Sequence, residues 1–143
     1  DLFAAHLGRL AQGSRLRNRP LSVCVLKVAD RVDVAAARRS GWLDRAIPQI
    51  GSMIGRLVRV EDTAARLGAE VFALALPATS LAAARSAAER IGAVIGCTAF
   101  ESGEGRPPFV VEFDIGVAPV TSPETAGRAL EEADAKALAR QAS

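Results

Sequence analysis

The stretch RVEDTAARLGAEVFALALP, residues 59–77, decides the fold, because it reads as two strands joined by a tight turn. Alternating and apolar residues favour a strand on each side, and Gly68-Ala69 falls where the turn is expected. The short apolar stretch LSVCVLKVA, residues 21–29, predicts a buried strand upstream of this hairpin. Apolar positions at helical spacing predict helices over residues 2–12, 43–57 and 80–95.

The rest of the chain continues this alternation of helices and strands. GCTAF and FVVEFDIGVAPV read as strands that flank the loop ESGEGRPP, and Ser122-Pro123-Glu124 predicts the start of a last helix. The order predicts an α/β fold with a mostly antiparallel, five-stranded central sheet flanked by helices, plus a small hairpin. We expect residues 1–143 to form one domain of a longer protein, because the chain opens inside an apparent helix.

Net charge, hydropathy and the numbers of cysteine and histidine residues argue against several classes of function. A formal net charge of +2 is too small to argue for a nucleic-acid polymer, and no apolar run is long enough to span a bilayer. Cys24 and Cys97 are expected to be buried and reduced, which suits the cytoplasm. His6 is the only histidine and no zinc spacing exists, so we expect neither a metal nor a cofactor.

Nearly all of the basic residues are arginines. Of the 18 basic residues, all but Lys27 and Lys136 are arginines, whose planar guanidinium suits phosphates and guanine edges. The alanine-rich composition offers a plainer explanation, because a compositional bias would also account for most of these arginines.

Four segments carry a family resemblance. LSVCVLKVADRV, RVEDTAARLGAEVFALALPATSL, FDIGVAPV and EEADAKALAR resemble, in the correct order, the GGDEF domain of diguanylate cyclases. The resemblance implies a ferredoxin-like, cyclase palm-type fold, in agreement with the order of elements. Active members join two GTP molecules into cyclic di-GMP, with two divalent cations that activate the attacking hydroxyl.

The resemblance also implies a degenerate active site. The GGDEF letters correspond to Gly68, Ala69, Glu70, Val71 and Phe72, so the third letter keeps an acid and the fourth loses one. The other implied positions are Lys27 and Ala29, where acids are expected, Ala35 and Asp44, where guanine contacts are expected, and Gln141, where a phosphate-binding lysine is expected.

A single acid cannot hold two Mg²⁺ ions, so we expect no catalysis. Our hypothesis is that Lys27 pairs with Glu70 and stands in for the lost metal. The alternative is that Lys27 holds a GTP phosphate in a catalytically dead pocket.

An inhibitory nucleotide site is implied by the same resemblance. Arg59 and Asp62 fill an RxxD motif, and five residues separate Asp62 from Gly68, which is the family's usual spacing. Arg90 matches a further family contact, and Arg15, Arg17 and Arg19 could offer a second surface to the ligand. The plainer alternatives are a surface salt bridge at a turn, a solvent-facing helix arginine and a solvated basic loop.

These features predict a cyclic di-GMP receptor without catalytic activity, which relays its signal through protein partners and forms a ligand-linked dimer. The pattern of lost catalysis with a kept RxxD resembles the PopA type of cell-cycle adaptor, which helps deliver substrates to a protease. The alternatives are a GTP-binding regulatory domain, a nucleotide-independent dimerisation scaffold and a residual diguanylate cyclase.

Overall fold

The computed structural model describes the backbone of residues 2–142 and the side chains of residues 2–137, so Gln141 lies outside the described side chains. The structure contains the predicted helices over residues 2–12, 43–57 and 80–95 and the predicted strand over residues 21–29, with small shifts in their ends. In chain order the helices and strands are α1 (Leu2–Leu16), β1 (Leu21–Val28), α2 (Val32–Ser40), α3 (Trp42–Leu57), β2 (Thr63–Gly68), β3 (Val71–Pro77), α4 (Leu81–Gly96), β4 (Phe113–Pro119), the short 3₁₀ helix η1 (Pro123–Thr125) and α5 (Ala126–Ala142).

The sheet has the strand order β2-β3-β1-β4, and each neighbouring pair is antiparallel. The prediction of a five-stranded sheet is wrong, because this sheet has four strands. The expected strand over residues 96–100 is reduced to one isolated bridge, in which Phe100 pairs with Phe109. Pro107 and Pro108 directly precede Phe109 and lack the backbone N–H that a longer ladder would need.

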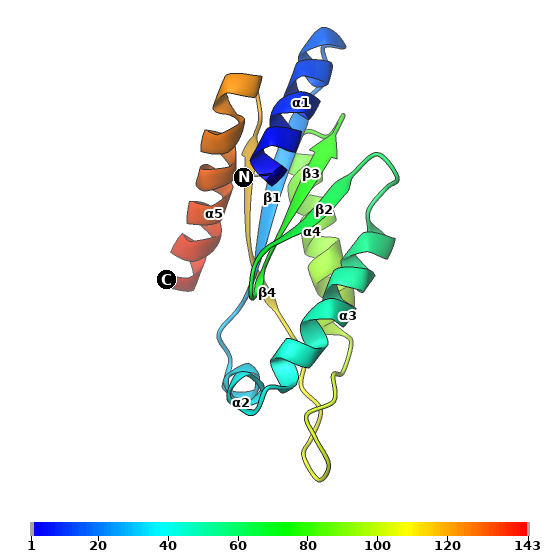
Figure 1. The fold of residues 1–143 in the computed structure, drawn as a ribbon, viewed down its shortest axis with the longest axis vertical. Coiled ribbons are helices and arrows are strands. Elements are labelled where there is room, and N and C mark those ends of the chain that lie inside the picture. The colour runs from blue at the N-terminus through cyan, green and yellow to red at the C-terminus, as the bar shows by residue number, and fades with distance from the viewer. Residues whose placement is uncertain (1, 143) are drawn as a thin grey trace.

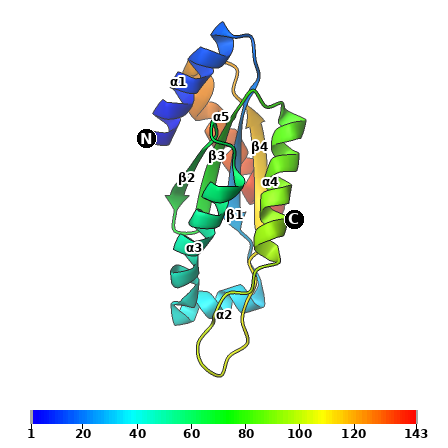
Figure 2. The ribbon, with the colours of Figure 1, turned by 90° about the vertical axis from the view of Figure 1, so that its right-hand side faces the viewer.

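Helices cover both faces of the sheet, with α3 and α4 on one side and α1 and α5 on the other (Figures 1 and 2). The strands supply both cores, because successive side chains of a strand point to opposite faces. Leu26 and Leu74 pack in the α3–α4 core, whereas Val25 and Ala73 pack in the α1–α5 core. The apolar run of β1 therefore reflects burial on two faces.

Helix α5 lies unusually close to β4 at Gly116. A Cβ atom at position 116 would lie 1.9 Å from the carbonyl oxygen of Ala133 and 2.7 Å from the backbone nitrogen of Ala137. Only glycine fits there, and alanines on the facing side of α5 allow the approach.

The structure corrects several local predictions. Helix α2, over Val32–Ser40, is an element that the apolar spacing did not predict, and Gly41 caps its end with φ +84. Helix α3 begins at Trp42, one residue before the predicted start at residue 43, with Asp44 in its first turn and Pro48 inside the helix. Cys24 is buried as expected, whereas Cys97 is exposed, and both are free thiols. Within residues 2–142 no helix is both long and apolar enough to cross a membrane.

Candidate functional site

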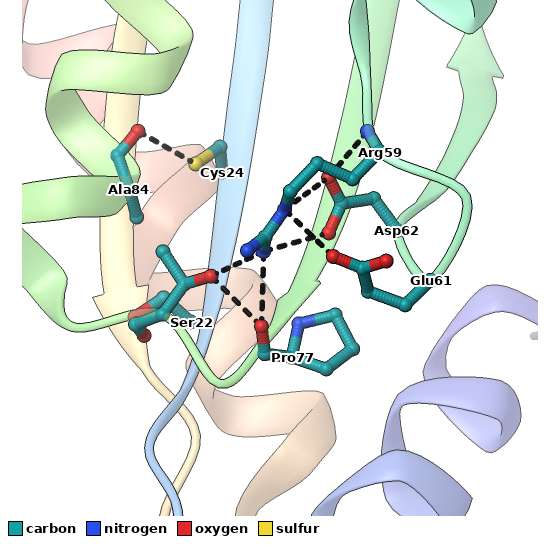
Figure 3. A network of polar contacts seen from close by, with 8 residues as sticks. Ser22, Cys24, Arg59, Glu61, Asp62, Pro77 and Ala84 are labelled. Carbon is teal, nitrogen blue, oxygen red and sulfur yellow. Dashed lines mark hydrogen bonds and ion pairs between the residues drawn. The ribbon is translucent and has the colours of Figure 1, made fainter.

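Arg59 and Asp62 lie in the turn between α3 and β2, and they bind each other (Figure 3). Oδ2 of Asp62 accepts hydrogen bonds from the backbone N–H of Arg59 at 2.8 Å and from its Nε at 3.1 Å. Oδ1 of Asp62 accepts from Nη2 of Arg59 at 3.0 Å. The Asp62 side chain is only 4% exposed, so this carboxylate is fixed in place.

Arg59 has further partners on β3 and on the loop that follows it. Its Nη2 donates to the carbonyl of Pro77 at 3.0 Å and to the hydroxyl of Thr79 at 2.6 Å. The side chain remains 50% exposed and also pairs with Glu61. Hydrogen bonding to Asp62 raises the pKa of Arg59 above its ordinary value, with partial burial opposing the shift. The guanidinium is therefore ordered and charged before any ligand arrives.

Arg90 of α4 completes this group. Arg59, Asp62 and Arg90 line one small cavity of about 40 Å³, together with Thr79 and the apolar residues Leu57, Val58, Leu76, Ala87 and Ile91. Arg90 is exposed, and no ion pair holds it among the side chains that the structure describes. The cavity has room for little more than a water molecule, so a larger group could contact these side chains only from the surface above it.

The arginines expected to form a basic loop lie next to this site, but Arg15 belongs to the last turn of α1 and only Arg17 and Arg19 follow the helix. Arg15 and Arg19 line a shallow hollow of about 430 Å³ between the end of α1 and the residues after β4, whereas Arg17 is not part of its lining. The N–H of Thr79 donates to the carbonyl of Pro20, at 3.3 Å, and Pro20 also lines the hollow. The hollow and the Arg59 site are therefore separate but joined by one backbone hydrogen bond.

The degenerate active-site positions are organised differently from the prediction. Glu70, in the turn between β2 and β3, accepts hydrogen bonds from Nε and Nη2 of Arg38, at 2.8 and 2.7 Å. Arg38 belongs to α2, and its Nη2 also lies 3.4 Å from Asp30. The hydrogen bond to Glu70 raises the pKa of Arg38 well above its ordinary range. The cation beside Glu70 is therefore an arginine.

The predicted pairing of Lys27 with Glu70 is wrong. Nζ of Lys27 lies 3.0 Å from Oδ1 of Asp134, on α5. The alternation of side chains along β1 explains why Lys27 does not reach Glu70. Lys27 and Val25 are two residues apart, so both side chains point to the α1–α5 face of the sheet. Val71, the register partner of Lys27 on β3, packs against the same core.

Two other degenerate positions contribute no metal ligand near Glu70. Ala29 is buried, and its N–H donates to the carbonyl of Glu112 at 2.8 Å. Asp44 is exposed on α3, and no described hydrogen bond joins it to the Arg38–Glu70 pair. Across the described residues, no group of three or more His, Cys, Asp or Glu side chains gathers to hold a metal.

Sequence reasoning missed Arg38, Thr79 and Asp134, which contact the predicted site residues. No sequence signal pointed to Arg38, since the apolar spacing did not predict the helix α2 that carries it. Thr79 lies two residues after the end of β3, and its hydroxyl contacts Arg59, which is 20 residues away in the sequence, so no spacing indicated it.

The comparisons agree with the fold. The family profile described as "Diguanylate cyclase, GGDEF domain" matches residues 10–142, so the chain belongs to the GGDEF family. No curated protein matches the chain.

Several solved structures are similar, each under 25% identical, so they show the fold alone. The GGDEF domain of FimX from Pseudomonas aeruginosa has a TM-score of 0.80 at 19% identity, over 97% of this chain and 85% of that one. The GGDEF domain of DgcB from Caulobacter crescentus, in complex with c-di-GMP, has a TM-score of 0.82 at 21% identity, over 97% and 82%. Diguanylate cyclase SiaD from Pseudomonas aeruginosa, in complex with its activator SiaC, has a TM-score of 0.80 at 24% identity, over 96% and 52%.

Proposed function

We propose that this GGDEF domain is a catalytically inactive cytoplasmic receptor, which binds cyclic di-GMP through Arg59, Asp62 and Arg90. The observation that carries the proposal is that these three side chains, from two separate parts of the chain, line one cavity. A guanidinium can donate paired hydrogen bonds to guanine or to a phosphate, and a carboxylate can accept from guanine N–H groups. A similar domain, DgcB of Caulobacter crescentus, was solved with c-di-GMP.

Three features support the loss of catalysis. Val71 has no carboxylate, Lys27 places a cation where an acid is implied, and Glu70 is already paired with Arg38. Phosphoryl transfer by two cations needs several carboxylates close together. The domain would then signal by contacts with protein partners, as the PopA type of adaptor does. Arg15, at the end of α1, and Arg19, in the loop after it, would supply a second ligand contact.

Calorimetric titration of the purified chain with cyclic di-GMP, and separately with GTP and Mg²⁺, tests the proposal. We expect cyclic di-GMP to bind and no cyclic di-GMP to form from GTP. The absence of binding would favour the alternative of a nucleotide-independent scaffold. Cyclic di-GMP formed from GTP above the level of a Glu70→Ala control would favour the alternative of a residual diguanylate cyclase.

Variants separate the contributions of the two arginines. Arg90→Ala is the clean test, because its exposed side chain has no described ion pair, and we expect about a tenfold loss of affinity. Arg59→Ala should cost about 1–3 kcal/mol of binding, but it also removes partners of the buried Asp62 carboxylate, so its thermal stability must be measured alongside. Arg59→Lys keeps the positive charge but lacks the planar guanidinium that donates paired hydrogen bonds, so this variant should also bind cyclic di-GMP weakly. Arg56→Ala, an exposed arginine on the last turn of α3, is the matched control.

A further inference from the structure

The structure contains an unexpected pair of buried polar residues behind the Arg59 site. Among the described residues, Ser22 and Thr79 are the polar residues that are buried as whole residues, at 1% and 7% exposure, within an otherwise hydrophobic core. A buried hydroxyl is unfavourable unless it is hydrogen-bonded, so this pair calls for a physical reason.

Thr79 is held by four hydrogen bonds. Its N–H donates to the carbonyl of Pro20 at 3.3 Å, and its carbonyl accepts from the hydroxyl of Ser22 at 2.9 Å. Its own hydroxyl donates to the carbonyl of Pro77 at 2.8 Å and accepts from Nη2 of Arg59 at 2.6 Å.

The backbone before Thr79 is itself unusual. Ala78 has a φ of +52, a conformation that costs energy for a residue with a side chain. Such a conformation persists where the surrounding contacts determine it, and here the bonds of Thr79 do so. The loop thus fixes both the position and the direction of one hydroxyl.

The guanidinium of Arg59 has one edge that is hydrogen-bonded within the protein and one end that is not. Nε and Nη2 are occupied by Asp62, Glu61, Pro77 and Thr79. No hydrogen bond to Nη1 is found among the described residues, so its two N–H groups remain for a ligand. Asp62 holds the guanidinium from the turn before β2, whereas Thr79, with the carbonyl of Pro77, holds Nη2 from the end of β3 and the loop after it.

We propose that Thr79 is a positioning residue for ligand recognition: held in place by Ser22, it fixes Arg59 through Nη2 and so leaves Nη1 available to a ligand. The inference rests on the proposed function, because it explains how the receptor prepares its arginine. A group that is ordered beforehand loses less freedom on binding, so removing the anchor weakens binding without removing any ligand contact.

Thr79→Val tests this directly, because valine keeps the shape and loses the hydroxyl. We expect cyclic di-GMP to bind the variant about five- to tenfold more weakly in calorimetry, and Thr79→Ser to restore most of the affinity. Thr98→Val is the control, since the exposed Thr98 hydroxyl only donates to Val94 at the end of α4. Equal affinity for Thr79→Val and the folded wild type would overturn the proposal, as would failure of Thr79→Ser to exceed Thr79→Val.

A second readout needs no ligand. In ¹⁵N NMR spectra, we expect the Nε–H of Arg59 to exchange with water more slowly in the wild type and Thr79→Ser than in Thr79→Val. If Thr79→Val does not fold, Ser22→Ala takes its place, because it removes the hydrogen bond from the Ser22 hydroxyl to the carbonyl of Thr79 and so loosens the loop. If the wild type binds no cyclic di-GMP, the proposed function fails, and unchanged exchange in these variants would separately overturn the positioning role.

Discussion

Arg38 binds both carboxylate oxygens of Glu70, with distances of 2.8 and 2.7 Å, at the turn between β2 and β3. The helix that carries Arg38 lies between β1 and α3, so the contact ties a separate element to the hairpin. A planar guanidinium on a carboxylate is the strongest common form of ion pair in proteins. Arg38 neutralises the Glu70 carboxylate without a metal, and its positive charge opposes the approach of a second cation.

The first prediction concerns the strength of that pair. A double-mutant cycle with Arg38→Ala and Glu70→Ala should give a coupling of about 0.5–1 kcal/mol in urea unfolding, because both side chains are partly exposed and solvent screens them. Raising the salt concentration should reduce the coupling. Arg39→Ala is the control, since Arg39 is an exposed neighbour on the same helix and its effect should add to that of Glu70→Ala. Additive effects of Arg38 and Glu70 would contradict the interpretation.

The second prediction concerns the charge at position 27. Lys27 faces Asp134 on α5 and is the register partner of Asp114 on β4, so Lys27→Asp would gather three acids. We expect a loss of about 1–2 kcal/mol in the free energy of unfolding, because like charges repel. Lys27→Met, which removes the charge alone, should cost less than about 1 kcal/mol.

Mg²⁺ gives this variant a second readout. Three carboxylates suit Mg²⁺, and a ligand that binds only the folded state stabilises it. Millimolar Mg²⁺ should therefore raise the melting temperature of Lys27→Asp, and leave Lys27→Met and the wild type unchanged. An equal response of all three proteins to Mg²⁺ would show that the acids at this position do not act together.

The fold could be predicted because its determinants are local. The turn predicted at Gly68-Ala69, which lies one residue later at Ala69-Glu70, the apolar run of β1 and the spacing of α3 and α4 each predict their own element. The order of elements then allows few topologies. The fifth strand was predicted wrongly because β-branched and aromatic residues around Phe100 and Phe109 favour strands, while the prolines between them stop the ladder after one bridge.

The candidate site could be predicted only where its residues are close in sequence. Arg59 and Asp62 bind each other as their spacing suggests, within one turn. The partners of Lys27 and Glu70 come from α5 and α2, and no spacing along the chain reveals which helix reaches which side chain. Thr79 shows the same limit, since its role depends on a turn 20 residues away in sequence.

The third prediction is a pH dependence from Cys24. Burial raises the pKa of this thiol from 9.0 to about 12, with Arg85 lowering it and Asp62 raising it by smaller amounts. Below pH 9.0 the thiol is neutral in both states, whereas between pH 9.0 and about 12 it ionises in the unfolded chain and stays neutral in the folded one. The thiol's contribution to stability is therefore lost as pH rises through this window, by up to about 1.4 kcal/mol per pH unit.

Urea titrations over this pH window check the prediction. The wild type should lose stability more steeply with rising pH than Cys24→Ala, which lacks the ionising thiol. Ellman's reagent offers an independent check, because exposed Cys97 should react in the native protein and Cys24 only after unfolding. Equal slopes for both proteins would show that Cys24 ionises in the folded state as readily as in the unfolded chain.

The fourth prediction tests the contact between α5 and β4. In Gly116→Ala the new methyl would lie 1.9 Å from the carbonyl oxygen of Ala133, and the backbone of two elements would have to separate. Overpacking against rigid backbone is destabilising, so we expect the variant to lose about 3 kcal/mol or more of unfolding free energy.

The control is a glycine with open space. A Cβ at Gly55, near the end of α3, meets nothing within 4 Å, so Gly55→Ala should stabilise the domain by about 0.5–1 kcal/mol through helix propensity alone. Urea unfolding followed by circular dichroism measures both variants. A loss below about 1 kcal/mol for Gly116→Ala would mean that α5 can shift outwards, and that its close approach to β4 contributes little to the stability of the α1–α5 core.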